Sequence, residues 1–260
     1  MLEALLFDVD GTLAETEESH RAAFNSAFRA ASLDWVWDPA LYRRLLQVAG
    51  GRERIRHYIA THQPEFARHS DLDALVARLH ADKSRRFAEI VRAGELGLRP
   101  GVMRLLREAR ACGLRLAIAT TTSLRNIAVL LETTVGREAM DWFEVIGAGE
   151  CVSTKKPALD IYYWVLTRMR LEAPACLAIE DSAIGLQAAL DAGIPTVITV
   201  SGFTVGEDFT GARAVLSDLG ELGQPFRLLY GDAYGRGCVD VELLRRWHAT
   251  ARTVRAPADR

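Results

Sequence analysis

Two aspartates that stand one residue apart close an apolar run near the start of the chain, in the stretch LLFDVDGT. Side chains two residues apart in a strand point to the same face, so Asp8 and Asp10 would border one small site. Carboxylates in such a place repel each other unless a cation or hydrogen bonds compensate them, and oxygen ligands suit Mg²⁺. Gly11 would let the backbone turn sharply away. The pattern predicts a metal-assisted reaction site, with two aspartates that cap a turn as the alternative.

Other polar residues stand at the ends of apolar, strand-like runs further along the chain. Such runs are expected as strands at 4–9, 114–120, 143–149, 176–181 and 196–200. Helical periodicity with a closing glycine marks 101–113 and 181–193. This alternation predicts an α/β fold with a doubly wound, Rossmann-like parallel sheet. Ligands of such sheets bind at the carboxyl ends of the strands, and Asp8, Thr120 and Asp181 all lie at predicted strand ends.

Residues 15–94 interrupt this alternation. The block contains no convincing strand and several amphipathic helical stretches, such as ESHRAAFNSAFRAA. We therefore expect an α-helical cap domain at 15–94, inserted into a Rossmann-like catalytic core made of 1–14 and 95–260. The glycines and proline of GELGLRPG are typical of a hinge on the second side of the insertion. Towards the end of the chain, DVELLRRWHAT predicts a terminal helix, and residues 253–260 are expected to fray.

Four motifs carry a resemblance to a known family: DVDGT at 8–12, AIATTTS at 117–123, KKPALDIY at 155–162 and AIEDS at 178–182. In order and spacing they resemble the haloacid-dehalogenase superfamily. The resemblance implies a phosphatase that works through an aspartyl-phosphate. It makes Asp8 the nucleophile and Asp10 the general acid and then the base. It also implies that Thr120 hydrogen-bonds the transferring phosphoryl group and that Lys156 neutralises its charge.

The same resemblance assigns the ligands of a Mg²⁺ cofactor. They would be Asp8, the backbone carbonyl of Asp10 and Asp181, with Glu180 as a further ligand or as an acid beside the ligands. Other interpretations remain open at these positions: Thr120 as an ordinary strand threonine, Glu180 as a structural residue, and a solvated lysine pair in place of Lys156.

The cap region resembles particular members of the superfamily. GTLAETEESH is similar to members with a helical cap, such as β-phosphoglucomutase and phosphoglycolate phosphatase, and it places Glu17 and His20 at the cleft between cap and core. Residues 34–59 resemble more specifically the CbbY-type phosphatases of Calvin-cycle operons, as do the threonines at 119–123. That resemblance implies hydrolysis of xylulose-1,5-bisphosphate, a Rubisco inhibitor, to xylulose 5-phosphate.

The stretch AGGRER is a candidate binding site for a second phosphate. Gly50 and Gly51 would supply backbone N–H groups, and Arg52 and Arg54 would supply cations, unless they form a solvated helix start. The other residues expected to bind substrate are Glu17, His20, Tyr42, Thr121 and Thr122, whereas Arg43 and Arg56 are expected to face water. A phosphoglycolate phosphatase would need no binding site for a second phosphate. A phosphosugar mutase would need one, and a phosphosugar-binding regulator would not need the nucleophile.

Composition narrows the classes of partner and location that the protein could have. A formal net charge of −2 over 260 residues gives no reason to expect nucleic acid or an anionic membrane as partner. No apolar run is long enough to span a membrane, and no signal peptide is evident. The four cysteines have no paired spacing and are expected to be buried, reduced thiols. We expect a cytoplasmic monomer whose partner is a small phosphorylated sugar.

Overall fold

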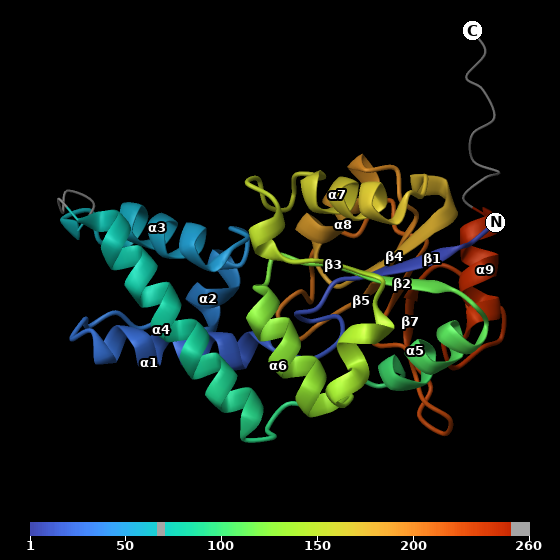
Figure 1. The fold of residues 1–260 in the computed structure, drawn as a ribbon, viewed down its shortest axis with the longest axis horizontal. Helices are drawn as coiled ribbons and strands as arrows, with labels where there is room; N and C mark the ends of the chain where they lie inside the picture. Colours follow the sequence, from blue (N-terminus) through green and yellow to red (C-terminus); the bar gives the residue numbers. More distant parts are fainter. Residues whose placement is uncertain (67–70, 251–260) are drawn as a thin grey trace, which may run out of the picture.

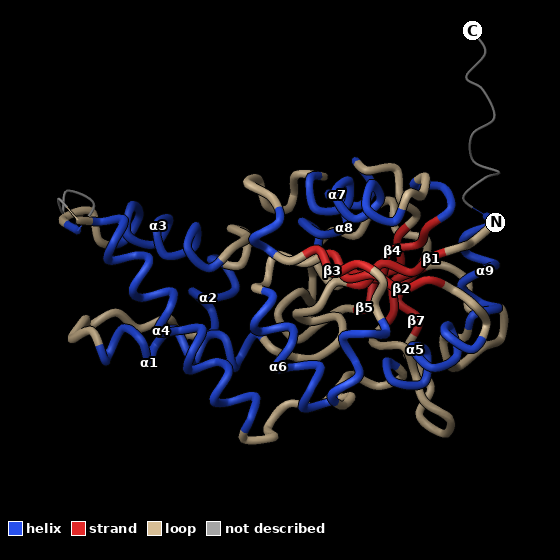
Figure 2. Tube along the Cα trace, in the orientation of Figure 1, coloured by secondary structure: helices blue, strands red, loops and turns tan. Residues whose placement is uncertain are grey.

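The computed structural model describes residues 1–66 and 71–250, and this part forms one seven-stranded sheet flanked by helices (Figure 1 and Figure 2). The strand order is β3-β2-β1-β4-β5-β6-β7, in which only β7 runs antiparallel to its neighbour. The strands are β1 (Ala4–Phe7), β2 (Arg115–Ala119), β3 (Val145–Gly147), β4 (Cys176–Glu180), β5 (Thr196–Thr199), β6 (Ala214–Leu216) and β7 (Leu228–Tyr230). The predicted α/β fold with a doubly wound parallel sheet is confirmed.

The five strands expected from the sequence are all present, but they are shorter than the apolar runs that predicted them. The run at 143–149, for example, contributes only the three residues of β3. The sequence did not predict β6 or β7. Each has only three residues, AVL in β6 and LLY in β7, and such short apolar runs do not by themselves predict a strand.

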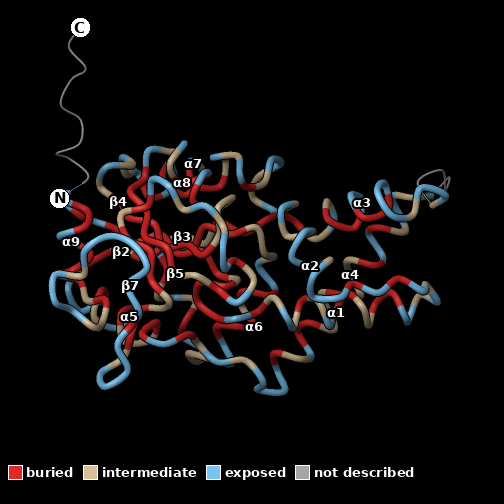
Figure 3. Tube along the Cα trace, turned by 180° about the vertical axis from the view of Figure 1, so that it is seen from behind, coloured by how far each residue is buried: buried red, intermediate tan, exposed pale blue. Residues whose placement is uncertain are grey.

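The sheet is buried on both faces because helices cover each of them. Along β1, Leu5 and Phe7 enter one apolar cluster with α5, α6 and α9, whereas Ala4 and Leu6 enter another with α7 and α8. These helices are α5 (Val102–Ala111), α6 (Leu124–Thr134), α7 (Asp160–Met169), α8 (Ala183–Asp191) and α9 (Val241–Thr250). Figure 3 shows buried residues along the strands of the sheet. The terminal helix expected at 240–250 is confirmed as α9.

The segment between β1 and α5 forms a group of helices beside the sheet (Figure 1). They are α1 (Glu17–Ala30), α2 (Pro39–Leu45), α3 (Gly51–His62) and α4 (Leu72–Arg92). They enclose an apolar cluster of their own, in which Trp37 packs against Phe24, Phe28 and Tyr58. The division into cap and core at residues 14/15 and 94/95 remains our proposal.

The two chain segments that connect these helices to the sheet meet at Arg99. Its buried guanidinium donates to the carbonyl of Gly11, and to those of Val200 and Ser217 at 2.7 Å each. Its Nε lies 3.1 Å from a carboxylate oxygen of Glu15 in the first connecting segment. A buried guanidinium needs partners for its five N–H groups, and these partners fix both connections at the carboxyl edge of the sheet.

Three smaller expectations have mixed outcomes. All four cysteines are free, but only Cys176 is buried, and the expectation of burial was wrong for Cys112, which is exposed at the end of α5. The fraying expected at 253–260 lies outside the described residues. Among the helices of the described residues, none combines the length and the apolar character that crossing a bilayer requires.

Candidate active site

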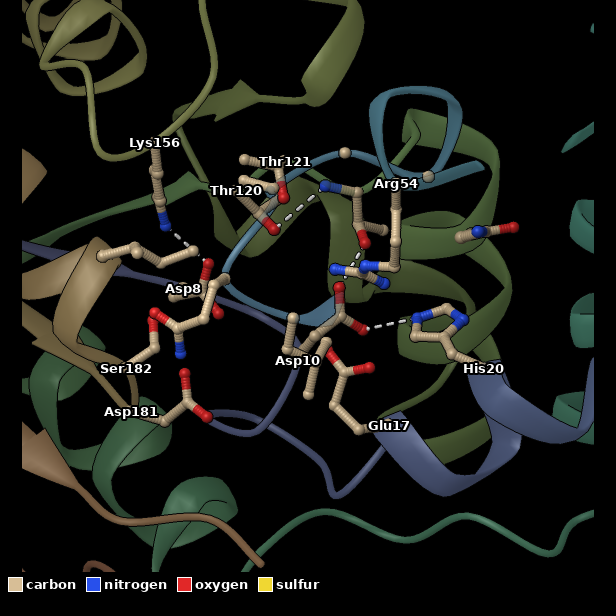
Figure 4. A pocket seen from close by; sticks show the side chains of 18 of the residues that line it. Asp8, Asp10, Glu17, His20, Arg54, Thr120, Thr121, Lys156, Asp181 and Ser182 are labelled. Atoms are coloured by element: carbon tan, nitrogen blue, oxygen red, sulfur yellow. Dashed lines mark hydrogen bonds and ion pairs between the residues drawn. The ribbon is translucent and has the colours of Figure 1, made fainter. Parts of the chain in front are cut away.

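The carboxyl ends of three neighbouring strands bring the predicted reaction residues together (Figure 4). Phe7 in β1 is level with Ile118 in β2 and with Ile179 in β4. Consequently Asp8, Thr120 and Asp181, which follow these strands, line one cavity. The expected convergence at the sheet edge is therefore present, and it follows directly from the strand order β2-β1-β4.

Gly11 is required for this convergence. Its φ of +81° lies in the left-handed region that other residues rarely adopt. A Cβ atom at this position would also lie 2.0 Å from Oδ2 of Asp181. The glycine therefore lets the turn after Asp10 pass directly beside the carboxylate that β4 supplies.

A buried lysine lies between two of the carboxylates. Lys156 Nζ is 2.6 Å from Asp8 Oδ1, 2.6 Å from Glu180 Oε1 and 2.8 Å from the carbonyl of Ala119. Burial alone would lower the pKa of Lys156, but the two carboxylates outweigh burial and raise that pKa. The hydroxyl of Tyr162 also donates to Glu180, at 2.6 Å. The ammonium is therefore held charged beside Asp8.

Asp8, Glu180 and Asp181 form a buried acidic cluster whose carboxylate oxygens lie within 4.8 Å of one another. Burial raises the pKa of Asp8 to about 8; the charge of Lys156 opposes this shift, and that of Glu180 adds to it. Burial and the charges of Asp8 and Glu180 also raise the pKa of Asp181 well above its usual range. A hard divalent cation would relieve this repulsion, and the donor set is all oxygen, so the residues present fit such a cation.

The carboxylate of Asp10 points away from that cluster, towards α1. It accepts hydrogen bonds from the hydroxyls of Thr16, at 2.5 Å, and Thr122, and it lies 3.0 Å from His20 Nε2. Burial would raise the pKa of Asp10, but the electrostatic attraction and hydrogen bond of His20 and the hydrogen bonds of the two hydroxyls lower it well below its usual range. The side chain of Asp10 is therefore engaged by these three donors and not by the acidic cluster.

His20 is itself oriented by a residue that the sequence analysis did not identify. Lys83, in α4, lies 2.8 Å from His20 Nδ1. Because an ammonium only donates, Nδ1 accepts, and Nε2 carries the proton that His20 donates to Asp10. The imidazole ring stacks on Phe87 at a centroid distance of 3.8 Å. Lys83 stands four residues after Leu79 and four before Phe87 on the buried face of the helix, and a lysine at such a position was the signal in the sequence.

We predict that replacing Lys83 with methionine stabilises the fold and lowers activity. Burial lowers the pKa of Lys83 to about 8, against an ordinary 10.5, although the charge of Asp10 opposes the shift. A lysine with a lowered folded pKa costs stability at every pH below that pKa, and the cost disappears as the pH rises towards 10.5. The Lys83→Met variant should therefore gain up to about 3 kcal/mol in free energy of unfolding at pH 7 and almost nothing at pH 10.5.

Urea unfolding at the two pH values measures this difference. Arg85→Met, at an exposed position of the same helix, is the matched control and should show no pH-dependent gain. An equal gain at both pH values in the Lys83 variant would contradict the burial argument. The loss of activity follows from the proton position on His20, because without Lys83 the imidazole is free to adopt the other tautomer.

The cap residues predicted to bind substrate differ in whether they reach the cavity. Glu17 and Arg54 line the cavity, but Tyr42 does not: it is fully buried, and its hydroxyl donates to Glu17 at 2.7 Å and accepts from Arg54 Nη1 at 3.2 Å. Arg54 Nε donates to the carbonyls of Leu45 and Val48, and in the described residues Nη2 has no protein acceptor. Tyr42 thus holds an acid and a guanidinium at the cavity wall and is not itself part of that wall.

The predicted glycines and threonines line the same cavity. Gly50 and Gly51 at the start of α3, together with Thr121, line both the cavity and a neighbouring pocket, whereas the exposed Arg52 lines only the neighbouring pocket. Thr120 and Thr122 line the cavity, and Thr122 binds Asp10 as described above.

Glu180 belongs to the acidic cluster but does not line the cavity. The cavity-lining residues that the sequence analysis did not identify are Leu46, Gln47, Ala49, His80, Lys83, Ser123, Asn126, Ser182, Ile184, Thr204 and Glu207.

Comparisons with known proteins agree with this geometry. The model of the haloacid dehalogenase-like hydrolase family matches residues 2–193. The protein CbbY of Cupriavidus necator is 48% identical over 247 residues, which cover 95% of this chain and 97% of that protein. A phosphorylated carbohydrates phosphatase of Thermotoga maritima is 30% identical over 76% of this chain and 85% of that protein.

Solved structures of CbbY from Rhodobacter sphaeroides have the same fold. One holds phosphate, and one of an aspartate-to-asparagine variant holds xylulose-1,5-bisphosphate. Each is 42% identical to this chain, with a TM-score of 0.78, and covers 86% of this chain and 97% of its own. The chain therefore belongs to the haloacid dehalogenase-like hydrolase family, as a phosphatase closely related to the CbbY proteins.

Proposed function

We propose that this phosphatase hydrolyses xylulose-1,5-bisphosphate to xylulose 5-phosphate, with Mg²⁺ as cofactor and Asp8 as the nucleophile. One observation carries the proposal: a single cavity has the Asp8–Lys156 pair in one wall and the guanidinium of Arg54 in another. A substrate with two phosphates fits such a pair of cationic groups. The bisphosphate held by the Rhodobacter sphaeroides protein supports this substrate class. We also expect a monomeric, cytoplasmic enzyme.

In the first half of the proposed reaction, Asp8 attacks the phosphorus atom of one phosphate. The bond between Asp8 Oδ and phosphorus forms while the bond to the sugar oxygen breaks, and Asp10 gives its proton to the leaving oxygen. The charge of the arriving phosphate raises the pKa of Asp10, so its carboxylate takes up a proton from solvent as the substrate binds and then donates that proton. Lys156 stabilises the charge on the phosphoryl oxygens, and Thr120 donates a hydrogen bond to them.

In the second half, a water molecule attacks the phosphorus atom of the aspartyl-phosphate. Asp10 accepts the proton from this water, the bond between phosphorus and Asp8 breaks, and phosphate leaves with the carboxylate restored. Three hydrogen-bond donors around Asp10 orient its carboxylate for this role. The Mg²⁺ ion, held by Asp8, Asp181 and the carbonyl of Asp10, would supply positive charge opposite the phosphoryl oxygens.

Phosphate release from a panel of substrates with Mg²⁺ tests this function. The panel contains xylulose-1,5-bisphosphate, ribulose-1,5-bisphosphate, 2-phosphoglycolate and β-glucose 1-phosphate, with the Asp8→Asn variant as the blank. The proposal predicts the highest kcat/KM for the xylulose bisphosphate. Preference for 2-phosphoglycolate would contradict the two-phosphate cavity, and conversion of β-glucose 1-phosphate to its isomer would indicate a mutase. Tight binding of the bisphosphate without turnover would favour a regulator.

We predict that Arg54→Gln raises KM for the bisphosphate about 10- to 100-fold, because charge-assisted hydrogen bonds to one phosphate are lost. For a monophosphate substrate, kcat/KM should change by less than about threefold, since Arg54 would contact only the second phosphate. Arg56→Gln is the matched control on the same helix, because Arg56 is exposed and pairs with Asp73. Equal losses for both substrate types would show that Arg54 acts through the cap structure alone.

A further inference from the structure

A loop of the core that follows β5 contacts the cap, far along the chain from both connecting segments. We call residues 202–207 the docking loop. Arg43 Nη2 donates to the carbonyl of Gly202 at 3.0 Å, and Gln47 Nε2 donates to Glu207 Oε1 at 3.1 Å. Between these contacts, the ring of Phe203 meets the ring of Tyr42 edge-on at a centroid distance of 5.6 Å and an interplanar angle of 87°.

Phe203 is a core residue that joins the apolar cluster of the cap. Within the described part of the chain, it is the one member of that cluster from outside residues 15–94. Its ring also lies 5.9 Å from the guanidinium of Arg43, an exposed residue of α2. The expectation that Arg43 only faces water was therefore incomplete. Opening of the cap would expose the Phe203 ring, so its packing favours the closed arrangement.

The docking loop is anchored to the segment that carries Asp181. Oε2 of Glu207 accepts a hydrogen bond from the backbone N–H of Ala183, at the start of α8, at 2.7 Å. The backbone N–H of Ser201 donates to Thr204 Oγ1 at 2.9 Å, which closes the base of the loop. Glu207 thus joins the cap, through Gln47, to the segment immediately after β4.

On the cap side, Phe203 contacts Tyr42, which orders the proposed binding site for the second phosphate. The hydroxyl of Tyr42 binds both Glu17 and Arg54, and these two residues line the cavity. A displacement of the Tyr42 ring would therefore move both of them. Packing between two rings is sensitive to such displacements because interiors are close-packed.

We propose that Phe203 is a positioning residue for substrate selection: its contact with Tyr42 places Arg54 and Glu17 at the cavity when the cap docks on the core. The inference rests on the proposed function. It deepens that function by assigning the selectivity for sugar bisphosphates over small phosphate esters partly to a core residue that does not line the cavity. A small ester such as p-nitrophenyl phosphate needs Asp8, Asp10 and Lys156 but has no second phosphate to bind at Arg54.

The test is the ratio of kcat/KM for xylulose-1,5-bisphosphate to that for p-nitrophenyl phosphate. In Phe203→Ala this ratio should fall about tenfold, mostly through KM for the bisphosphate. Phe203→Leu, which keeps apolar contact, should recover most of the ratio. Val205→Ala is the control, because Val205 is exposed on the same loop. Arg43→Ala, at a surface position, should lower the ratio about threefold and provides a second variant if Phe203→Ala folds poorly.

A double mutant separates positioning from a general effect on the fold. Tyr42→Phe keeps the ring but removes the hydroxyl that binds Glu17 and Arg54, so Phe203→Ala should lower the ratio by less than about threefold in that background. An unchanged ratio in both Phe203→Ala and Arg43→Ala overturns the proposal, as does a full tenfold fall in the Tyr42→Phe background. A wild-type enzyme without preference for the bisphosphate would overturn the proposed function itself, and this result is visible before any variant is made.

Discussion

Replacing Asp8 with asparagine is expected to lower kcat by at least about 10⁴-fold, because a neutral amide cannot take the phosphoryl group as the proposed carboxylate nucleophile does. The Lys156 ammonium, 2.6 Å from Asp8 Oδ1, would orient the proposed nucleophile, and an amide cannot act as that nucleophile. Asp208→Asn is the matched control at an exposed position and should leave kcat unchanged. Residual turnover above about 1% in a correctly folded Asp8→Asn protein would contradict the assignment.

The same substitution should change how stability depends on pH when no divalent cation is present. Because burial raises the folded pKa of Asp8 to about 8, the folded state holds a proton that the unfolded state loses at lower pH. The free energy of unfolding of the metal-free wild-type protein should therefore fall as the pH rises from about 4 to 8. Asp8→Asn removes this group, so its fall should be shallower.

Thermal melts in EDTA and in excess Mg²⁺ measure this effect without relying on activity. Mg²⁺ should raise the Tm of the wild-type protein most at the alkaline end, where the acidic cluster is ionised. It should raise the Tm of Asp8→Asn much less, because a proposed anionic ligand is replaced by a neutral amide. A Mg²⁺-induced rise that is equal in the two proteins would contradict a role for Asp8 in holding the cation.

Replacing Lys156 with methionine is expected to impair both the fold and the reaction. The substitution leaves Asp8 Oδ1 and Glu180 Oε1 buried without the ammonium that lies 2.6 Å from each of them. Removing one partner of a buried ion pair costs about 3–5 kcal/mol of stability. Loss of the cation beside the transferring group should lower kcat by about 10³-fold.

The neighbouring lysine provides the control for this variant. Lys155 donates to the backbone carbonyls of Gly149 and Val152 and forms no ion pair within the described residues, so Lys155→Met should cost much less stability. Adding Glu180→Gln to Lys156→Met should recover part of the stability, since one uncompensated charge is removed, but none of the activity. Recovery of activity in that double mutant would mean that Lys156 serves only to neutralise Glu180.

The sequence predicted the parts of the site that local patterns determine. Apolar runs marked β1, β2 and β4, and the rule that parallel strands share a carboxyl edge was enough to bring Asp8, Thr120 and Asp181 together. The same reasoning did not find β7, whose three residues are all exposed. A strand at the edge of a sheet is defined by its pairing partner, and the three apolar residues of β7 are too short a run to predict a strand by themselves.

Contacts between distant segments could not be predicted from the sequence. Lys83 reaches His20 across 63 residues, and Gln47 reaches Glu207 across 160. Tyr42 was expected to contact the sugar, yet its ring is buried in the cap and only its hydroxyl reaches Glu17 and Arg54. Such positions depend on how the cap helices pack together and on the core, and no local periodicity records that packing.

The most direct test of the proposed aspartyl-phosphate is a single-turnover experiment with rapid acid quench. Excess enzyme is mixed with xylulose-1,5-bisphosphate and Mg²⁺, and phosphate bound to the peptide that contains Asp8 is followed by mass spectrometry beside free phosphate. Phosphorylated Asp8 should rise before free phosphate and decay as free phosphate appears, and Asp10→Asn should delay both events. Free phosphate that appears at the full rate with no phosphate on Asp8 at any time would contradict this intermediate.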